Sequence, residues 1–324
     1  MIDTDATAAF IRRTQQPDGA IPWFTGGKLD PWDHVEAAMG LDSAGFHREA
    51  AAAYRWLART QNPDGSWHAE YRDSHPVELA RDANFTAYIA VGAYHHFLST
   101  QDSSFLEELW PTVDSAMAFV LSMQAEDGAI RWRENPDGTF QSEKLLTGNC
   151  SIHHALTTAN RIAGHLGHER PQWTSAADRI RDAVLHHTGS FLPKSLAMDW
   201  YYPVLTGLRP LPDLEPRWNV FVHPERGVRC VDHEPWTTGG ETAELALALA
   251  AHGDIPRATA LLAAAEHLAA GDGSYWTGHN YDTDTIWPRE RTTWTAGAIL
   301  LAQSAIHGSP PALAVFGAKA CAPT

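Results

Sequence analysis

Cysteine and long apolar runs are both scarce in this chain. The three cysteines, Cys150, Cys230 and Cys321, are scattered and form no CxxC pair, so neither a disulfide framework nor a zinc knuckle is indicated. No segment approaches the roughly 18–20 apolar residues that a membrane-spanning helix needs. The acidic start MIDTDATAAF also lacks the basic and apolar parts of a secretory signal. We therefore expect a cytoplasmic protein that enters no membrane.

Positive charge is scarce as well. Lys and Arg number 24 against 39 Asp and Glu, which gives a formal net charge of −15, and no block of Lys and Arg is present. Such a surface would repel nucleic acid and anionic membranes. The sequence also contains no phosphate-cradling glycine loop and no GxSxG. A neutral or cationic partner is favoured, without a nucleotide cofactor.

Metal-binding patterns are weak. The histidines include three adjacent pairs, at 95–96, 153–154 and 186–187. Neighbours on a helix point in different directions, so none of these pairs has the i, i+4 spacing of a zinc site. Cys230, Asp232 and His233 could in principle meet at one ion, but a Cys near a His is common in loops without metal. We expect neither a metal nor any other cofactor.

Apolar residues at helical spacing recur throughout the chain, whereas no alternating strand of any length is evident. Examples are HREAAAAYRWLARTQ, SFLEELWPTVDSAMAFVLSMQ and ETAELALALAAHG. Short links that carry Gly, Pro or a capping residue alternate with long loops rich in Gly, Trp and His. If helices alternate between an outer and an inner ring, the short links lie at one end and the long loops at the other. This arrangement is an all-α (α/α)6 toroid.

Six inner helices are expected, each after a long loop. Their predicted starts lie near Trp32, Asp82, Thr147, Asp199, Thr238 and Thr292. The fifth outer partner, around PDLEPRWNVFV, is weakly patterned. Helix pairs of this kind bury their apolar faces only by stacking into one core, so we predict a single catalytic domain over residues 1–308 and a tail over 309–324. Functional residues concentrate on long loops, which places the site at their end of the ring.

Four stretches share nearly the same spelling. They are RTQQPDGAIPW from residue 13, RTQNPDGSW from 59, SMQAEDGAIRW from 122 and GDGSYW from 271. In the longer three, Gln ends an outer helix, Asp-Gly makes a turn and Trp begins a long loop, which indicates a scaffold element. The four tryptophans are Trp23, Trp67, Trp132 and Trp276. We expect most of them to fill the rim of the ring and Trp276 to contact substrate.

The first turns of the inner helices carry acids among aromatic side chains. The candidate catalytic carboxylates are Asp33, Asp82, Asp199 and Glu241. The candidate substrate-binding residues are Trp32, His34, Tyr88, Trp200, Tyr201, Tyr202, Trp236, Trp276, His279 and Trp294. Aromatic rings pack on the apolar faces of sugars, while carboxylates accept hydrogen bonds from sugar hydroxyls. Paired carboxyl groups also suit glycoside hydrolysis, in which an acid protonates the leaving oxygen and a carboxylate activates water or attacks the anomeric carbon.

Each acid also has a purely structural interpretation. Asp33 follows the predicted cap Asp30, in a first turn where the helix dipole favours any carboxylate. Glu241 stands at the T-x-x-E spacing of a capping box. Asp82 and Asp199 could each cap a helix or be a buried partner for an Arg.

The repeats resemble the QW motif of squalene and hopene cyclases, which also fold as toroids of helices. The DxDD motif of those enzymes is missing, because Thr285 stands where DTDT at 282–285 would need its last acid. A closer resemblance is carried by the motifs DPWDHVEAA, DWYYPVL, PWTTGGETAEL, YWTGH and WPRERTTWTAGA. These are similar to an actinobacterial group with a loose prenyltransferase-like label, and within it to the mycobacterial methylmannose polysaccharide hydrolases. The resemblance implies an endo-acting α-mannosidase that cuts an α-1,4-linked, partly methylated mannan.

We therefore predict a glycoside hydrolase acting on an oligo- or polysaccharide, with Asp33 and Glu241 as acid and base and with Asp199 and Asp82 in reserve. Positions on the first and fifth inner helices place the preferred pair across the pore, which leaves room for a water and favours inversion. Two other classes stay open. A terpenoid cyclase or prenyltransferase-like enzyme needs a mostly apolar cavity, and a non-catalytic carbohydrate-binding toroid needs aromatics without a facing pair of acids.

Overall fold

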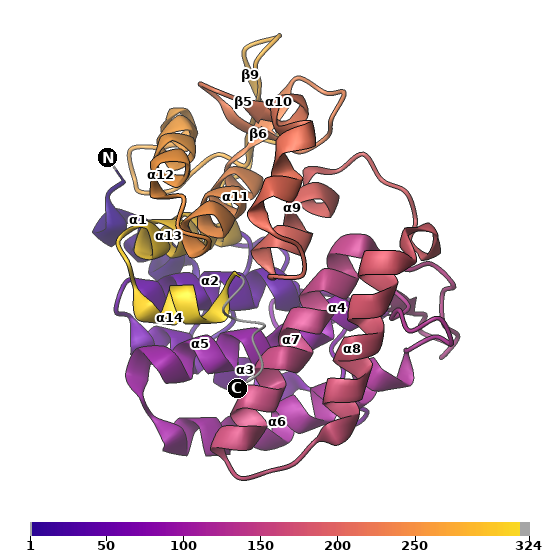
Figure 1. The fold of residues 1–324 in the computed structure, drawn as a ribbon. Coiled ribbons are helices and arrows are strands. Elements are labelled where there is room, and N and C mark those ends of the chain that lie inside the picture. Colours follow the sequence, from indigo (N-terminus) through magenta and orange to yellow (C-terminus); the bar gives the residue numbers. More distant parts are fainter. Residues whose placement is uncertain (1, 318–324) are drawn as a thin grey trace.

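Helices alternate between an inner and an outer layer of a closed ring in the computed structural model, which describes residues 2–317 (Figure 1). The inner layer consists of α2 (Pro31–Ser43), α4 (Ala83–Ala87) continued by α5 (Ile89–Thr100), α7 (Leu146–His165), α9 (Ala197–Leu205), α11 (Gly239–Ala251) and α13 (Thr293–Ile306). The outer layer consists of α1 (Thr4–Thr14), α3 (His47–Thr60), α6 (Ser103–Ser122), α8 (Pro171–His186), the short pair η2 (Leu211–Arg217) and α10 (Trp218–Phe221), and α12 (Ile255–Ala264).

The inner helices contact one another in the order α2, α13, α11, α9, α7, α5 and back to α2. The predicted (α/α)6 ring is thereby confirmed. Each predicted inner start lies within two residues of the observed one, the largest difference being Asp199 against Ala197. The weakly patterned fifth outer position is the one that holds only short helical turns.

Inner and outer helices differ in how much of their surface is covered. Every residue of α11 from Gly239 to Ala250 is buried, since neighbours cover this helix on all sides. α2 and α13 approach so closely that a Cβ on Gly40 would lie 2.5 Å from the Cα of Gly297. An outer helix such as α3 buries one stripe, made of Ala50, Ala51, Ala53, Tyr54, Trp56 and Leu57.

The strands are two to four residues long and lie in the connections. They are β1 (Glu70–Arg72), β2 (His75–Glu78), β3 (Arg81–Asp82), β4 (Arg133–Glu134), β5 (Val222–His223), β6 (Gly227–Arg229), β7 (Trp236–Thr238), β8 (Gly278–Asn280) and β9 (Thr285–Ile286). Two further turns are η1 (Thr188–Ser190) and η3 (Ala265–Leu268). Strands β5 to β9 form one antiparallel sheet that joins the loops preceding α11 and α13 (Figure 1). Strands of two to four residues are too short to show an alternating apolar and polar pattern in the sequence.

The repeated Gln and Gly residues join each outer helix to the next. The side-chain amide of Gln61 donates to the carbonyl oxygens of Gly65, in its own turn, and of Thr112 in α6, both at 2.9 Å. A Cβ on Gly65 would lie 2.1 Å from the carbonyl oxygen of Ser115, so only glycine permits this approach. The same pair of bonds is made by Gln15 to Gly19 and Glu49, and by Gln124 to Gly128 and Ala176.

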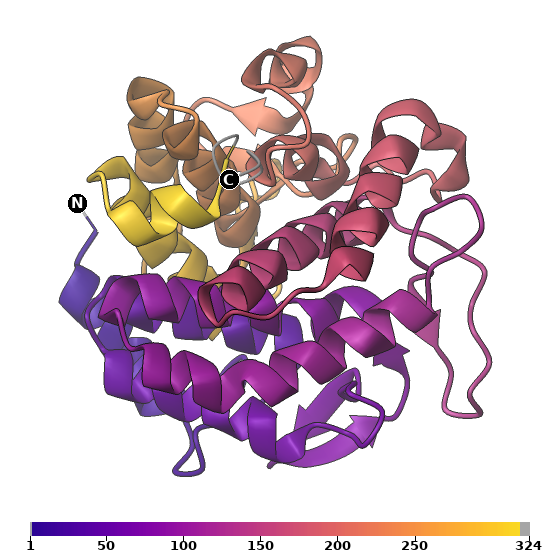
Figure 2. The ribbon, with the colours of Figure 1, turned by 60° about the horizontal axis from the view of Figure 1, so that its bottom comes forward.

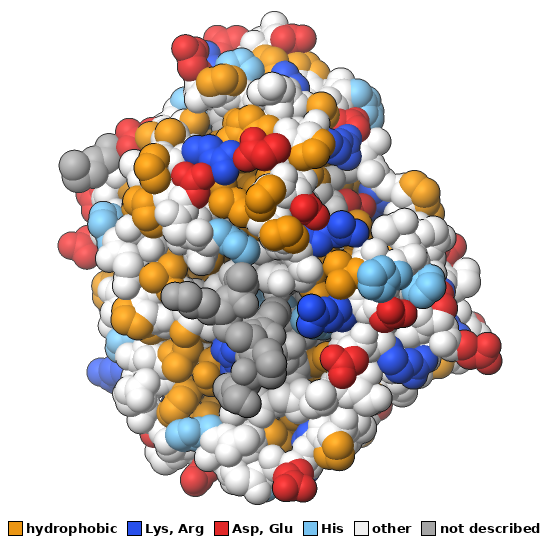
Figure 3. Space-filling view, viewed as in Figure 1, with side chains coloured by type: hydrophobic (Ala, Val, Ile, Leu, Met, Phe, Trp, Pro, Cys, Tyr) orange, Lys and Arg blue, Asp and Glu red, His pale blue; other side chains and the backbone are white. Residues whose placement is uncertain are grey.

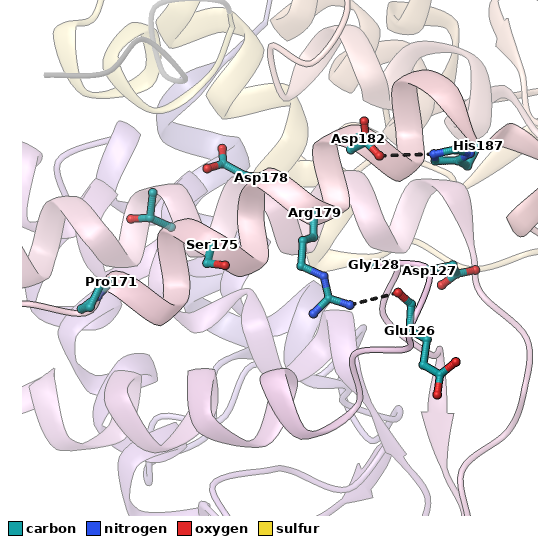
Figure 4. A pocket seen from close by; sticks show the side chains of 10 residues that line it. Glu126, Asp127, Gly128, Pro171, Ser175, Asp178, Arg179, Asp182 and His187 are labelled. Atoms are coloured by element: carbon teal, nitrogen blue, oxygen red, sulfur yellow. Dashed lines mark hydrogen bonds and ion pairs between the residues drawn. The ribbon is translucent and has the colours of Figure 1, made fainter.

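The third of these joints lies beside the surface depression drawn in Figure 4. The guanidinium of Arg179 on α8 donates to the carbonyl oxygens of Ala125 at 2.8 Å and Glu126 at 3.2 Å. Asp182 and His187 form an ion pair at the end of the same helix, with atoms 3.2 Å apart. The turn after α6 is thus held by its own Gln124 amide and by the guanidinium of Arg179 on the next outer helix, α8.

The fourth repeat closes the ring. It lacks the Gln, but a Cβ on its Gly273 would lie 2.2 Å from the carbonyl oxygen of Ala6 in α1. Arg13 at the end of α1 donates to the carbonyl oxygen of Asp272 at 3.1 Å. The last full helix pair is therefore joined to the first outer helix by the same element that joins the earlier ones.

Removing one joint should destabilise the protein. In Gln61→Ala the carbonyl oxygens of Gly65 and Thr112 lose their donor in a half-buried position, and we expect a loss of about 1–3 kcal/mol in the free energy of unfolding. The measurement is the urea midpoint at unchanged m-value. Gln141→Ala is the control, because that amide bonds only the side chain of Asn135 on a loop. An equal loss in both variants would contradict a role of the repeat in joining helices.

The C-terminal segment covers the end of the ring where the inner helices finish (Figures 1 and 2). Helix α14 (Pro310–Val315) packs against α5, α11 and α13. Nε2 of His154 in α7 lies 2.7 Å from the carbonyl oxygen of Val315, and the backbone N–H of Gly317 donates to the last residue of α9, Leu205. The first part of the predicted tail, 309–324, is thus packed on the ring, whereas 318–324, including Cys321, lies outside the described residues.

The surface around α14 mixes side chains of both charges with apolar ones, and Lys and Arg stand singly on this face (Figure 3). Within residues 2–317, no helix combines the length and the apolar composition needed to cross a membrane.

Candidate active site

A cavity of about 380 Å³ opens at the end of the ring where the inner helices begin. Its walls are aromatic and apolar, from Trp23, Trp32, Phe85, Met198 and Trp294. The ring of Trp294 lies against Gly240, where a Cβ would be 1.9 Å from its Cζ3. The double glycine before Glu241 therefore makes room for one wall of the cavity.

A wider depression of about 870 Å³ lies on the outer surface between α8 and the turn at 126–128 (Figure 4). It is lined by Glu126, Asp127, Gly128, Pro171, Thr174, Ser175, Asp178, Arg179, Asp182 and His187. This set contains no Trp, Tyr or Phe on which a sugar could pack. The smaller cavity in the ring is therefore the candidate active site.

Seven carboxyl groups line the cavity: Glu70 and Glu78 come from β1 and β2, and the other five from the starts of two helices. Asp30, Asp33 and Glu36 belong to the start of α2, and Glu241 and Glu244 to the start of α11. Residues three apart on a helix lie on one face, so Asp33 and Glu241 form an upper pair and Glu36 and Glu244 a lower pair one turn deeper. Helix α13 lies between α2 and α11. The upper pair therefore faces the cavity from next-nearest helices, and not from opposite sides of the pore as the helix count suggested.

Asp33 is held as an acid by its neighbour Asp30. One carboxylate oxygen of Asp30 accepts the backbone N–H of Asp33 at 2.9 Å and the other accepts Nε1–H of Trp23 at 2.9 Å. Burial, followed by the charge of Asp30, raises the pKa of Asp33 well above its usual range, and the two side chains also share a hydrogen bond. Burial raises the pKa of Asp30 as well, but the shared hydrogen bond lowers the pKa of Asp30 and raises that of Asp33, so the proton belongs on Asp33.

Glu241 is surrounded by donors. The hydroxyl of Thr238 donates to its Oε2, and the thiol of Cys230 is also hydrogen-bonded to it. The capping box that the sequence offered as an alternative is not formed, because the Thr238 side chain caps no backbone N–H of α11. Glu241 is instead an acceptor, with its position fixed by two side chains, and it is only 8% exposed.

The lower pair is bound to three tyrosines. The hydroxyl of Tyr88 donates to Oε2 of Glu36 at 2.8 Å, and those of Tyr201 and Tyr202 donate to the two oxygens of Glu244. Burial raises the pKa of Glu36 to about 7. Burial and then the charge of Glu36 raise the pKa of Glu244 well above its usual range. Neither acid was among the sequence-derived candidates.

The two reserve acids do not line the cavity, and each is bound to a residue of another segment. Asp82 forms a two-pronged ion pair with Arg133, with N–O distances of 2.6 and 3.0 Å. Asp199 accepts the backbone N–H and the hydroxyl of Thr147, at 3.1 and 2.5 Å, and so ties α9 to the start of α7. Of these four residues only Arg133 lines the cavity.

The aromatic candidates fall into three groups. Trp32 and Trp294 line the cavity. Tyr88, Tyr201 and Tyr202 donate hydrogen bonds to the lower acids, which line it. The remaining candidates are placed elsewhere by their contacts. Trp200 stacks on Phe221, His34 lies buried between Ile21 and Ala53, Trp236 donates to Trp287, Trp276 lies under Arg291, and His279 pairs with Asp284.

The four tryptophans of the repeats also differ in where they lie. Trp67 is fully buried and donates to the carbonyl oxygen of Leu57. Trp132 carries the guanidinium of Arg133 over its ring. Trp23 lines the cavity, whereas Trp276, the expected contact, does not. Within the described chain, no three His, Cys, Asp or Glu side chains converge in a way that could hold a metal ion.

Known proteins resemble the chain in sequence and in fold. No family model matches it. A relative from Mycolicibacterium hassiacum, described as MMP endo-(1,4)-3-O-methyl-alpha-D-mannosidase, is 46% identical over 315 residues, which are 96% of this chain and 88% of the relative. The chain belongs to this glycoside hydrolase family. The family membership agrees with the cavity, in which carboxyl groups are paired between aromatic walls.

Solved structures share the fold of the hydrolase. A glycosidase variant in complex with glucose superposes with a TM-score of 0.74 at 16% identity, covering 94% of this chain and 96% of that one. A D-mannose isomerase gives a TM-score of 0.71 at 11% identity over 94% of this chain and 96% of that one. At these identities the likeness establishes the (α/α)6 fold of the hydrolase.

The buried lower pair should make the hydrolase less stable as pH rises. Glu36 has an ordinary pKa of 4.5 and a folded pKa of about 7, so between these values the folded state keeps a proton that the unfolded chain has released. The contribution of Glu36 to the free energy of unfolding should therefore be largest below about pH 4.5 and fall up to about pH 7, by on the order of 3 kcal/mol. Chemical denaturation at pH 5 and pH 8 measures this fall.

Glu36→Gln should lessen the fall with pH, since an amide does not titrate. Glu107→Gln on the exposed face of α6 is the matched control and should leave it unchanged. An identical pH dependence in wild type and Glu36→Gln would show that Glu36 titrates normally.

Proposed function

We propose that this hydrolase cleaves internal α-1,4 linkages in a mannan whose sugars carry 3-O-methyl groups. The observation that carries the proposal is the position of Asp33 and Glu241 in one cavity between Trp32 and Trp294. Their local contacts fit two different roles, since Asp33 is held protonated and Glu241 is held as an acceptor. The activity for which the 46% identical relative is named supports the choice of substrate.

The proposed reaction uses the upper pair as acid and base. Asp33 transfers its proton to the leaving glycosidic oxygen, while Glu241 removes a proton from a water that attacks the anomeric carbon. The C–O bond to the leaving sugar breaks, a C–O bond to water forms, and the proton on Glu241 is later released to solvent. Attack from the face opposite to the leaving group gives an inverted product. The lower pair lies a helical turn away from these steps.

The apolar walls support a methylated substrate. Each O-methyl group replaces a hydroxyl donor with apolar surface, and its burial against Trp23, Phe85 or Met198 is favourable by roughly 25 cal/mol per Å². The seven carboxyl groups of the cavity disfavour an isoprenoid substrate, which would need a cavity lined by carbon. The net charge of −15 disfavours a polyanion. We also propose an intracellular substrate, a setting in which Cys150 and Cys230 can stay free thiols.

The test is incubation with α-1,4-linked mannooligosaccharides, 3-O-methylated and unmethylated, and with α-1,4-glucan as the control. Products are identified by mass and the first anomer is observed by time-resolved NMR. We expect internal cleavage of the methylated mannan with the β anomer appearing first. The proposal would be overturned by cleavage of none of the mannans or by release of single sugars from one end. If the α anomer appeared first, the reaction would retain the configuration and the inverting mechanism would be wrong.

A further inference from the structure

We propose that Glu36 and Glu244 form a floor that selects the bound sugar by its free hydroxyl groups and turns its methyl ether toward the aromatic walls. The inference rests on the proposed function and assigns the lower pair a role in specificity. The pair does not take part in the bond-breaking steps described above. The role follows from which carboxylate atoms are already bonded and which face the cavity.

Glu36 offers one acceptor to a ligand. Its side chain lines the cavity and is only 3% exposed. Oε2 accepts the hydroxyl of Tyr88 at 2.8 Å, whereas Oε1 accepts no hydrogen bond from any residue in the described part of the chain. This carboxylate oxygen faces the cavity and must take its donor from there. A ligand hydroxyl that reaches the floor would supply the missing donor.

Glu244 adds acceptors beside it. Its two oxygens accept the hydroxyls of Tyr201 and Tyr202, and each carboxylate oxygen has a second lone pair. The three phenolic protons are used within this network. When both carboxyl groups are ionised, the floor therefore presents oxygen atoms that need donors.

A methylated mannan has few hydroxyl groups that can donate a hydrogen bond to the floor. In an α-1,4-linked chain of 3-O-methylmannose, C1 and C4 are in linkages and O3 is an ether, so only the hydroxyls at C2 and C6 remain. A hydroxyl both donates and accepts, but a methyl ether only accepts. Methylation of the hydroxyl that meets the floor would leave Oε1 of Glu36 unpaired. A site built to bond a hydroxyl strongly rejects an analogue without the donor.

The test compares three synthetic tetrasaccharides of α-1,4-linked 3-O-methylmannose. One is unmodified, one carries an extra methyl on every C2 hydroxyl, and one on every C6 hydroxyl. At pH 8, above the pKa of Glu36, wild type should cleave the unmodified compound and show a kcat/KM lower by about 100-fold or more on one of the analogues. A decrease of less than about threefold on both analogues would overturn the inference while the proposed function stands.

Glu36→Gln gives a second, opposite readout. Tyr88 would hold the amide oxygen, so the NH₂ group would face the cavity and replace an acceptor by a donor. We expect KM for the unmodified tetrasaccharide to rise about 10- to 100-fold with kcat within about threefold, and the discrimination against the rejected analogue to shrink. Glu244→Gln should act in the same direction and covers the case in which Glu36→Gln fails to fold. Glu107→Gln is the control.

Two further results bear on the inference. If Glu36→Gln slows turnover by about three orders of magnitude while KM stays unchanged, Glu36 belongs to the chemistry and its role in specificity is overturned. If wild type cleaves none of the three compounds or their unmethylated parent, the proposed function fails and this inference fails with it.

Discussion

Asp33→Asn is expected to lower kcat for a natural linkage by about 10²–10⁴-fold, with KM nearly unchanged. The amide keeps the size of the side chain and lies in the same contacts with Asp30, but it has no proton to give to the leaving oxygen. Burial and the charge of Asp30 raise the pKa of Asp33 well above its usual range, which favours the protonated form that a general acid needs. Wild-type activity should accordingly decline as pH rises through that pKa, and the pH profile of kcat/KM measures this.

A substrate whose leaving group needs no protonation separates this role from a structural one. On a mannooligosaccharide with a 2,4-dinitrophenyl leaving group, Asp33→Asn should regain most of the lost rate. Asp282→Asn, on an exposed loop, is the control and should behave as wild type on both substrates. An equal loss on both substrates would show that Asp33 is needed for the shape of the site and not for proton transfer.

Glu241→Gln is expected to have an effect of similar size, about 10²–10⁴-fold in kcat, but on both kinds of leaving group. The base acts on water, so a better leaving group does not replace it. Glu241→Ala opens space for a small anion, and azide should then attack the anomeric carbon without losing a proton while Asp33 still protonates the leaving oxygen.

The product of azide rescue reports the stereochemistry directly. Attack from the face of the missing carboxylate gives a β-mannosyl azide if the hydrolase inverts. Formation of an α-azide would require a covalent intermediate on the protein and would contradict the assignment of Glu241 as base. The stability of Glu241→Ala, measured by thermal unfolding, should be close to that of wild type.

Much of the fold could be predicted because the ring repeats itself. Each inner helix follows a long loop and begins with polar residues, so six starts could be placed within two residues. The repeated Gln and Gly could be recognised as scaffold, but their partners could not, since Gln61 bonds Thr112 fifty-one residues away. The loop sheet from β5 to β9 could not be predicted, because its pairings join strands too short for any pattern.

The site was predictable only where a first helical turn reaches the cavity. Asp33 and Glu241 lie there with Trp32 and Trp294. Glu36 and Glu244 lie one helical turn further along α2 and α11, where the neighbouring residues are apolar and buried. The signal that could have identified them is the spacing of three residues that separates each from the acid before it, Asp33 or Glu241. The partners of Asp82 and Asp199 come from other loops of the chain, so the sequence could not separate these acids from the pair in the cavity.

The closure of the ring also orders the events of synthesis. Helix α1 packs on α13 and is joined to the turn at 271–276, yet it leaves the ribosome long before these partners do. About 280 residues separate the end of α1 at Thr14 from the start of α13 at Thr293, which corresponds to about 15–55 s at roughly 5–20 residues per second. During that interval the apolar face of α1 lacks α13 as a neighbour, and the cavity acquires its complete set of walls only after α13 has been made.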